Sequence, residues 1–253
     1  MPVTVGEVWR AIDAFAPFAL AEEWDNVGLL AGRPDQNVTG ILCALDLNFL
    51  VIEEAVRLGA NLIVTHHPIL FRGRKNLRED EPEGRMLCSL VRNNLALIAA
   101  HTNFDNASPG VNDALAARLG LKELVELPEG MRMGLPEERT LGAFRDRVER
   151  TLGGPVRMYG EAAQSVKSVA LLGGAGGDYA AIARDAGADV YLTGEIAHHK
   201  AWDAYHSGMC VLEAGHAATE LPAIHLLADG LQKAADGVKW NVRIHESEAA
   251  LFR

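Results

Sequence analysis

The sequence predicts an α/β protein made of two similar α/β/α halves with mostly parallel sheets, related by an internal duplication. Short apolar segments typical of buried strands alternate with segments of helical period along most of the chain. The same order of strands and helices occurs twice, and polar residues follow the strands at matching places. Because open parallel sheets bind ligands at the carboxyl ends of their strands, these places are candidate functional sites.

The first half begins with a predicted helix over residues 4–15, where Thr4 and Glu7 have the spacing of a capping box. The segment EEWDNVGLL (22–30) follows as a loop that leads into a short strand. The rhythm of strands and helices then begins, because apolar segments bounded by polar residues alternate with helical ones. The predicted elements are a strand at 40–46, a helix at 49–58, a strand at 61–65, a helix near 84–94 and a third strand from 95.

The second half repeats this order, with strands at 168–172 and 189–193 on either side of a helix at 179–186, and a helix near 198–207. GANLIVTHH (59–67) aligns with GADVYLTGE (187–195) without a gap, and the Gly, Ala and Thr residues are identical. The third strands are LALIAAHTNFD and CVLEAGHAATE, and each ends in a histidine with a carboxylate four positions later. These matches favour an internal duplication.

The halves are expected at residues 1–127 and 128–237. The intervening segment 127–160 contains three prolines and an amphipathic pattern near 139–152, and we expect it to form the crossover. The segment GVKWNVRIHE alternates apolar and polar residues, which predicts a closing strand within 238–246. This strand could complete the first half, but the sequence leaves open which sheet it joins.

The composition argues against several classes of protein. The chain has 253 residues and a formal net charge of -10, which argues against nucleic acid as a partner, because phosphate binding needs clustered Lys and Arg. Its apolar runs are too short for a membrane span, and the charged N-terminus argues against a signal peptide. Cys43, Cys88 and Cys210 lack CxxC spacing, so we expect neither disulfides nor a cysteine zinc site. A cytoplasmic protein without a membrane partner is therefore expected.

The polar residues at the strand ends have the chemistry of a metal site, which we expect in the cleft between the halves. Imidazole and carboxylate groups without thiolates suit divalent ions such as zinc, manganese, iron or nickel. Six candidate ligands are more than one ion can use, so we expect two ions about 3.5–4 Å apart, bridged by a carboxylate and a water. The candidates are His66, His67, His101, Asp105, His216 and Glu220.

Three further features carry weaker signals. His198 and His199 fall at the start of a predicted helix, and we expect them on the surface or behind the ligands. GGAGGD (173–178) could cradle a phosphate with its amides, but it does not match GxGxxG and a tight turn is favoured. FRGRK (71–75) is either a solvated loop or a cationic segment that steers an anionic substrate.

Over nearly its whole length, the chain resembles the dinuclear-metal, ring-forming family labelled NGG-interacting-factor-like, also called the GTP cyclohydrolase 1 type 2 family. The resemblance implies a homohexamer, a trimer of dimers shaped as a toroid with its metal sites facing the interior. Longer members carry an additional domain between the halves, for which the segment 127–160 has no room. The landmarks are EEWDNVGLL (22–30), THHP (65–68), HTNFD (101–105), LTGE (192–195) and GHAATE (215–220).

The resemblance also implies the ligand set. His67 and Asp105 would hold one ion, His66 and His216 the other, and Glu220 would bridge both. His101 then falls outside the ligand set and becomes a proton-transfer candidate. Where the family pattern often has a pair of histidines, this chain has Gly215 before His216, so one imidazole that could line the pocket is missing.

By this resemblance, the expected activity is metal-dependent hydrolysis of a nucleotide or related phosphorylated small molecule. In the GTP cyclohydrolase version, a metal-bound hydroxide attacks C8 of guanine, opens the imidazole ring and releases formate. His101 or Glu195 would move protons, and Arg72, Arg74 or Lys75 would meet the triphosphate. Two alternatives stay open: a metal-dependent phosphoesterase or nucleotidase, and a metal-binding ring protein without turnover. The sequence does not determine the native metal, since several divalent ions accept these ligands.

Overall fold

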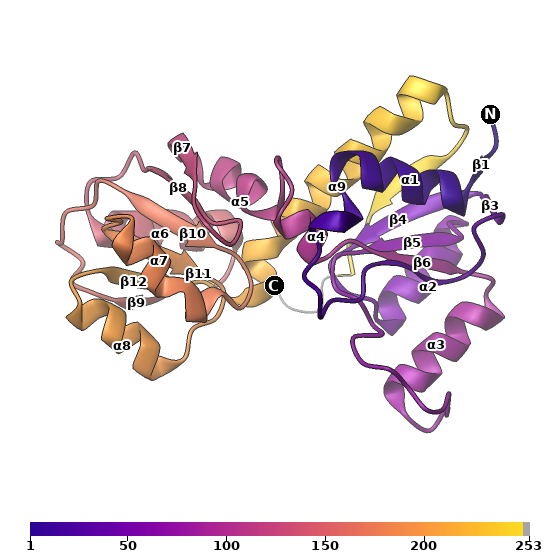
Figure 1. Ribbon diagram of the computed structural model, residues 1–253, viewed down its shortest axis with the longest axis horizontal. Coiled ribbons are helices and arrows are strands. Elements are labelled where there is room, and N and C mark those ends of the chain that lie inside the picture. Colours follow the sequence, from indigo (N-terminus) through magenta and orange to yellow (C-terminus); the bar gives the residue numbers. More distant parts are fainter. Residues whose placement is uncertain (250–253) are drawn as a thin grey trace. The chain divides into compact units, whose positions relative to one another are not determined.

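A computed structural model describes residues 1–249, which form two compact units, each built around its own sheet (Figure 1). Unit 1 has a five-stranded sheet in the order β13-β4-β5-β6-β2, in which only the edge strand β2 is antiparallel to its neighbour. The strands β1 and β3 form a separate antiparallel pair. The elements of unit 1 are β1 (Val3–Thr4), α1 (Val5–Phe15), η1 (Phe18–Leu20), β2 (Gly28–Ala31), β3 (Asn37–Val38), β4 (Gly40–Ala44), α2 (Phe49–Leu58), β5 (Leu62–Thr65), α3 (Pro82–Arg92), β6 (Ala96–Ala99), α4 (Thr102–Asp105) and β13 (Arg243–Glu246).

Unit 2 has a six-stranded sheet in the order β7-β8-β10-β11-β12-β9. Its core of β10, β11 and β12 is parallel, and antiparallel strands flank the core on both sides. The predicted α/β class with mostly parallel sheets is therefore confirmed. The elements of unit 2 are α5 (Val111–Leu119), β7 (Lys122–Glu126), β8 (Arg132–Leu135), α6 (Leu141–Leu152), β9 (Arg157–Tyr159), β10 (Val169–Leu172), η2 (Gly176–Tyr179), α7 (Ala180–Asp185), β11 (Val190–Thr193), α8 (His198–His206) and β12 (Cys210–Glu213); α9 (His216–Val238) begins in this unit and ends in unit 1.

The compact units divide the chain after Ser108 and after Ala223, whereas the sequence places the halves at 1–127 and 128–237. The first difference arises because α5 packs against α6, β8 and β10, which belong to unit 2. The second arises because the later turns of α9 lie against α1 in unit 1. Helix packing therefore determines these boundaries, and the alternation of strands and helices in the sequence does not reveal that packing.

The parallel strands bury side chains on both faces of each sheet. In unit 2, Leu171 of β10 packs with α5 and α6, whereas Tyr191 of β11 packs with α7 and α8. In unit 1, Leu42 of β4 packs with α2 and α3, and Figure 1 shows α1 and α9 on the other side of that sheet. Burial of each such large apolar side chain stabilises the fold by roughly 1.5–3 kcal/mol. Each unit is thus a three-layer α/β/α structure that can hold its strand ends rigidly.

The C-terminal strand is shorter than the predicted segment 238–246, and the structure shows which sheet it joins. β13 pairs in parallel with β4, so it completes unit 1. The helix α9 continues to Val238 because Leu227, Leu231 and Ala235 are buried at intervals of four residues, and this helical period outweighs the short alternation that follows. No helix within residues 1–249 has the length and apolar content needed to cross a membrane.

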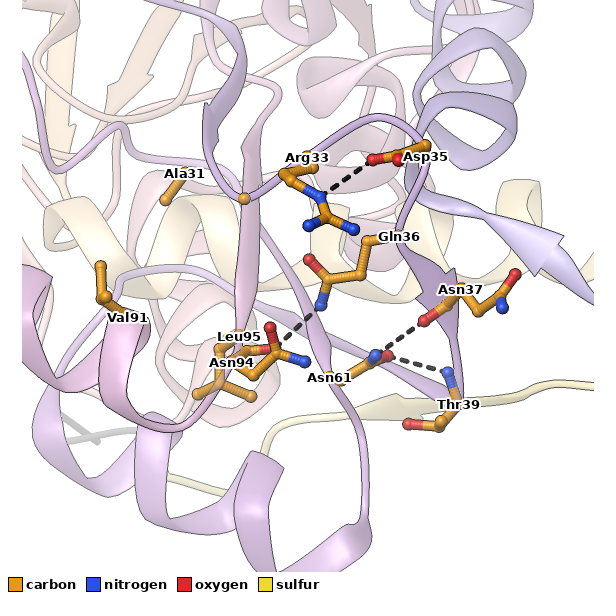
Figure 2. A pocket seen from close by; sticks show the side chains of 11 residues that line it. Ala31, Arg33, Asp35, Gln36, Asn37, Thr39, Asn61, Val91, Asn94 and Leu95 are labelled. Atoms are coloured by element: carbon orange, nitrogen blue, oxygen red, sulfur yellow. Dashed lines mark hydrogen bonds and ion pairs between the residues drawn. The ribbon is translucent and has the colours of Figure 1, made fainter.

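A hollow of about 520 Å³ lies at the amino ends of the strands in unit 1 (Figure 2). Carboxamides line it, and hydrogen bonds within the fold engage those of Asn61 and Gln36. Asn61 accepts from the Thr39 amide and donates to the Asn37 carbonyl, both at 2.8 Å. Gln36 donates to the Asn94 carbonyl at 2.8 Å. Parallel sheets bind ligands at the opposite edge, so these carboxamides serve to fix the starts of the strands.

Replacing Asn61 by alanine is expected to lower the free energy of unfolding by about 1–2 kcal/mol, because two backbone groups lose their hydrogen-bond partner. Urea denaturation measures this change. Gln232→Ala removes one exposed hydrogen bond to Asp236 within α9 and is the control, with an expected change below about 0.5 kcal/mol. Equal stability of Asn61→Ala and the wild-type protein would contradict the role assigned to this side chain.

Candidate metal centre

The chain turns at the end of β5 and brings two histidine rings together. The successive amides of His66 and His67 donate to the carbonyls of Ala44 and Leu45 at 3.1 and 2.9 Å. In a regular parallel strand, successive amides point in opposite directions, so the extended conformation ends here. The Thr65 hydroxyl donates to the His67 carbonyl at 2.8 Å and stabilises the turn. The two ring centres therefore lie only 4.9 Å apart instead of on opposite faces.

Hydrogen bonds determine which ring nitrogen of these histidines carries the proton. His66 Nδ1 lies 2.9 Å from the Ala100 carbonyl oxygen, and His67 Nδ1 lies 2.8 Å from Asp46 Oδ1. Carbonyl and carboxylate oxygens only accept hydrogen bonds, so each Nδ1 is assigned the hydrogen and donates it. The lone pair of each neutral ring is then on Nε2, the arrangement in which a histidine binds a metal.

His101 is held in the same way by a carboxylate from a distant loop. Its Nδ1 lies 3.0 Å from both oxygens of Asp25, and Asp25 also accepts from the Thr102 amide at 3.0 Å and hydroxyl at 2.5 Å. Burial raises the pKa of Asp25, but the hydrogen bonds from His101 and Thr102 outweigh this and bring the pKa to about 2. The ligand-capable nitrogens of His66, His67 and His101 all lie within 4.8 Å of one another.

Asp105 lies beside this group on the one-turn helix α4. Its amide and that of Phe104 donate to the His101 carbonyl at 3.0 and 2.8 Å, so His101 also anchors the helix that carries Asp105. Asp105 Oδ1 lies 3.7 Å from Nε2 of the fully buried His66. The structure thus gathers the four candidates of unit 1 into one group, the unit 1 cluster, which consists of His66, His67, His101 and Asp105.

Two residues of this arrangement were not identified from the sequence. Asp46 follows β4, and Asp25 lies in the EEWDNVGLL loop, 76 residues before His101. An acid just after a parallel strand is a signal that could have identified Asp46. For Asp25 the signal is weaker, because a loop residue gives no indication of which distant side chain it meets.

A second group, the unit 2 cluster, consists of His216, Glu220 and Glu195. His216 and Glu220 lie one turn apart at the start of α9, with His216 Nε2 and Glu220 Oε2 3.1 Å apart. Two ligand atoms about 2.1 Å from one ion lie about 3.0–3.4 Å apart at octahedral or tetrahedral angles, so this pair can hold a single ion. His216 Nδ1 lies 3.5 Å from Glu195 Oε2, on the side of the ring away from Glu220. Glu220 is buried, whereas Glu195 is exposed.

The GGAGGD loop provides space for the unit 2 cluster. Gly174 has a φ of +63°, and a Cβ atom there would lie 2.2 Å from Glu220 Oε1. The amides of Gly173 and Gly174 donate to the side chains of Asn112 and Thr219 at 2.8 and 3.0 Å. Because these two amides already have partners within the fold, they are not available to a phosphate, which favours the tight turn.

The predicted equivalence of His101 and His216 is wrong by one residue. In each unit, the second and third parallel strands end in register. From this common end, His101 is the second residue beyond β6 and precedes a helix, whereas His216 is the third residue beyond β12 and begins one. Gly215 occupies the place of His101 in unit 2. Strand pairing sets position in space, so the identical residue letter was misleading.

His198 and His199 form another histidine pair, in unit 2. His198 and His199 are exposed at the start of α8, as the sequence predicts. The His198 ring lies 6.1 Å from the buried Tyr159 and 6.2 Å from the exposed Trp202.

The cationic segment FRGRK divides into residues of different roles. Arg74 forms ion pairs with Glu81 and Glu83 and is mostly buried, so it stabilises the loop before α3 and is not available to a triphosphate. Arg72 and Lys75 are exposed. The candidate contacts to an anionic ligand are thereby reduced to these two side chains.

The donors of both clusters fit divalent metal ions. Imidazole nitrogens and carboxylate oxygens are ligands for zinc, manganese, iron and nickel. In the unit 1 cluster, each of the three imidazoles has its Nδ1 next to an accepting oxygen, which is the outer contact typical of metal-binding histidines. The chemistry and the orientation of the donors therefore agree with a metal-binding role.

Replacing Gly174 by alanine is expected to weaken zinc binding at least about tenfold, because the new Cβ displaces the Glu220 carboxylate. Isothermal titration calorimetry of the metal-free protein measures this affinity. Gly153→Ala is a matched control, since Gly153 has a φ of +78° and nothing within 4 Å of the Cβ position. Both variants should lose about 1–2 kcal/mol of stability to backbone strain. Unchanged zinc affinity in Gly174→Ala would exclude the assigned role of Glu220.

The Asp25 carboxylate is expected to contribute about 2 kcal/mol to the stability of the metal-free protein at neutral pH. Its pKa is lower in the folded than in the unfolded state, so this contribution is present above about pH 4 and is lost as the pH falls towards 2. Asp25→Asn should therefore be destabilising at pH 6 and much less so at pH 2.5. Asp35→Asn, which removes an exposed ion pair with Arg33, is the control for urea denaturation at both pH values. A pH-independent effect of Asp25→Asn would contradict the expectation.

Comparisons with known proteins give matches over nearly the whole chain. Residues 3–250 match the family described as Duf34/NIF3 (NGG1p interacting factor 3). A "GTP cyclohydrolase 1 type 2 homolog" from Streptomyces coelicolor is 39% identical, with 96% of this chain and 91% of the relative covered. A protein of the same name from Clostridium acetobutylicum is 32% identical, with 98% and 97% covered.

Two solved structures have the same fold. A Bacillus cereus protein related to NIF3 matches with a TM-score of 0.94 and 26% identity, covering 99% of this chain and 98% of that one. Reduced HcgD from Methanocaldococcus jannaschii matches with a TM-score of 0.82 and 27% identity, covering 96% and 98%. The resemblance inferred from the strand-end motifs is thus confirmed, and the chain belongs to the Duf34/NIF3 family.

Proposed function

We propose that the protein is a dinuclear metal-dependent hydrolase that acts on a nucleotide or a related phosphorylated small molecule. One observation carries this proposal: three imidazoles of the unit 1 cluster have Nδ1 engaged by an accepting oxygen, and their ligand-capable nitrogens gather within 4.8 Å. The relatives named GTP cyclohydrolase 1 type 2 homolog support a hydrolase without establishing turnover in this chain.

The ligands proposed for the two ions come from both clusters. His67 and Asp105 would hold one ion, His66 and His216 the other, and Glu220 would bridge them. The distance of 3.1 Å between His216 and Glu220 supports a shared ion for that pair. Asp105 Oδ1 lies 3.7 Å from His66 Nε2, which supports placing both residues in one dinuclear centre.

Bound at this site, two divalent ions would supply activation of water at neutral pH. His101 is then the proposed proton acceptor, at Nε2, because Asp25 holds the hydrogen of Nδ1 and stabilises the ring when it becomes charged. A general base placed in this way contributes typically about 10²–10⁴-fold to a rate. His101 thus differs from the proposed ligands in its task although it lies among them.

Glu195 has a more specific proposed role than a general proton shuttle. Its carboxylate faces His216 Nδ1 at 3.5 Å, where it would orient the ring and keep the lone pair on Nε2. Its exposed position also allows it to pass a proton to solvent. In both roles Glu195 acts on or beside the proposed ligand His216 and does not itself bind a metal ion.

The finer proposal is ring opening of GTP with release of formate, in which the exposed Arg72 and Lys75 would meet the phosphates. A homohexamer is proposed from the family resemblance, and a cytoplasmic location from the composition of the chain. The net charge of -10 gives these two cations particular importance, because an anionic substrate would otherwise be repelled.

Elemental analysis of the purified protein tests the metal part of the proposal, with two divalent ions expected per chain. Glu220→Ala is expected to lose both ions, since it removes the bridging ligand. His101→Ala should keep them and lose activity. His199→Ala, an exposed histidine of α8, is the control and should retain both. Equal metal loss in the His101 and Glu220 variants would remove the distinction between the proton acceptor and the ligands.

Incubation of the metal-loaded protein with GTP and with a pool of phosphoesters tests the reaction. Mass spectrometry should detect formate and a ring-opened product from GTP. Release of inorganic phosphate without formate would instead identify a phosphoesterase or nucleotidase. Bound metal without any product would identify a metal-binding protein and would overturn the hydrolase.

A further inference from the structure

Two exposed aromatic side chains lie beside the unit 1 cluster. Trp24 is 58% and Phe71 47% exposed, and their ring centres are 5.5 Å apart with an angle of 51° between the rings. Each ring centre also lies 6.2 Å from that of His101, with its plane steeply inclined to the imidazole. Large aromatic side chains that gather at the surface commonly mark a binding site. Here they gather at the residue proposed to accept a proton.

The backbone on both sides of these rings is anchored. Asp25, next to Trp24, accepts hydrogen bonds from His101 and from Thr102. Asn26 donates from its side chain to the Leu70 carbonyl at 2.6 Å, and Phe71 directly follows Leu70. The loop that carries Trp24 is therefore tied both to His101 and to the loop that carries Phe71. Rings held in this way are preorganised for a ligand, because little further ordering is needed on binding.

We propose that Trp24 and Phe71 form a stacking surface for the planar heteroaromatic ring of the substrate. The substrate class would then be anions that carry a nucleobase or a similar ring, and simple phosphoesters would be poor ligands. This inference rests on the proposed function and specifies its substrate. An aromatic face binds any such ring by stacking, worth roughly 1–3 kcal/mol per base.

The charges nearby agree with an anionic ring compound. Arg72 follows Phe71 directly, Lys75 lies three residues further on, and both side chains are exposed. A ring stacked on Trp24 or Phe71 would lie next to His101, with cations available for its phosphate. A stable contact with a second protein would instead require about 800 Å² of matching surface on each partner, more than two side chains provide.

Binding of GMP and of ribose 5-phosphate to the full-length, zinc-loaded protein tests this inference, because the two probes differ by the base. Isothermal titration calorimetry should show tighter binding of GMP. Trp24→Leu and Phe71→Leu should each weaken GMP binding by roughly 5–100-fold and leave ribose 5-phosphate unchanged. Trp24→Phe should retain most of the GMP affinity but lose the quenching of tryptophan fluorescence by GMP. Trp202→Leu, at an exposed tryptophan of α8, is the control and should bind GMP like the wild type.

Equal binding of the two probes by the wild-type protein, or unchanged GMP affinity in Trp24→Leu, would overturn the inference. A change of oligomer size in Trp24→Leu, measured by size-exclusion chromatography with light scattering, would also overturn it, because the rings would then face another copy of the chain. The proposed function is judged separately by metal content and products. A protein that holds two ions and hydrolyses a simple phosphoester without preferring GMP would keep the hydrolase and refute the stacking surface.

Discussion

The hydrogen bond from His66 Nδ1 to the Ala100 carbonyl is the contact on which the candidate metal centre depends. The Ala100 amide donates to Thr65 at 2.9 Å, so the pairing of β5 with β6 continues beyond the strand ends and fixes the carbonyl that receives His66. His66 is fully buried, and a buried polar ring without partners would destabilise the fold by roughly 1–3 kcal/mol. The sheet therefore sets both the position of this ring and the nitrogen that it presents.

The two units reach a similar local arrangement by different means. In unit 1, a backbone carbonyl and two carboxylates engage the outer nitrogens of three histidines. In unit 2, glycine creates the room, since the carboxylate of Glu220 occupies the space where a side chain of Gly174 would be. A duplicated framework of parallel strands thus supplies equivalent strand ends, while the side chains placed there have diverged. The difference is clearest at Gly215, which occupies the position that His101 has in unit 1.

The order of strands and helices can be predicted well from the sequence, whereas the exact alignment of equivalent residues in the two units cannot. Alternating apolar strands and amphipathic helices are strong signals, so the α/β class, the parallel strands and their polar ends were predicted correctly. The edge strand β7 is solvent-exposed along its whole length, and it carries no apolar run to indicate it. The extent of α9 and the partner of Asp25 depend on tertiary packing, which local pattern does not encode.

The candidate residues themselves could be identified because adjacent histidines at a strand end are a rare combination, and the family motifs narrowed their roles. Of their outer partners, Asp46 carries a signal because it follows a parallel strand, whereas Asp25 could not be identified, since its loop meets His101 only in the folded chain. The sequence also does not show which cations of FRGRK (71–75) are available to a ligand. Arg74 is engaged by glutamates that follow it in the chain. The sequence pattern thus identifies the residues that can donate to a metal, and the fold determines which of their atoms do so.

The most direct test of the dinuclear centre is a crystal structure of the metal-loaded protein with anomalous diffraction recorded at the absorption edge of the metal. Two peaks per chain are expected, each about 2.0–2.3 Å from Nε2, and not Nδ1, of the coordinating histidines among His66, His67 and His216. A single peak, coordination through Nδ1, or peaks at the histidines of α8 would contradict this expectation.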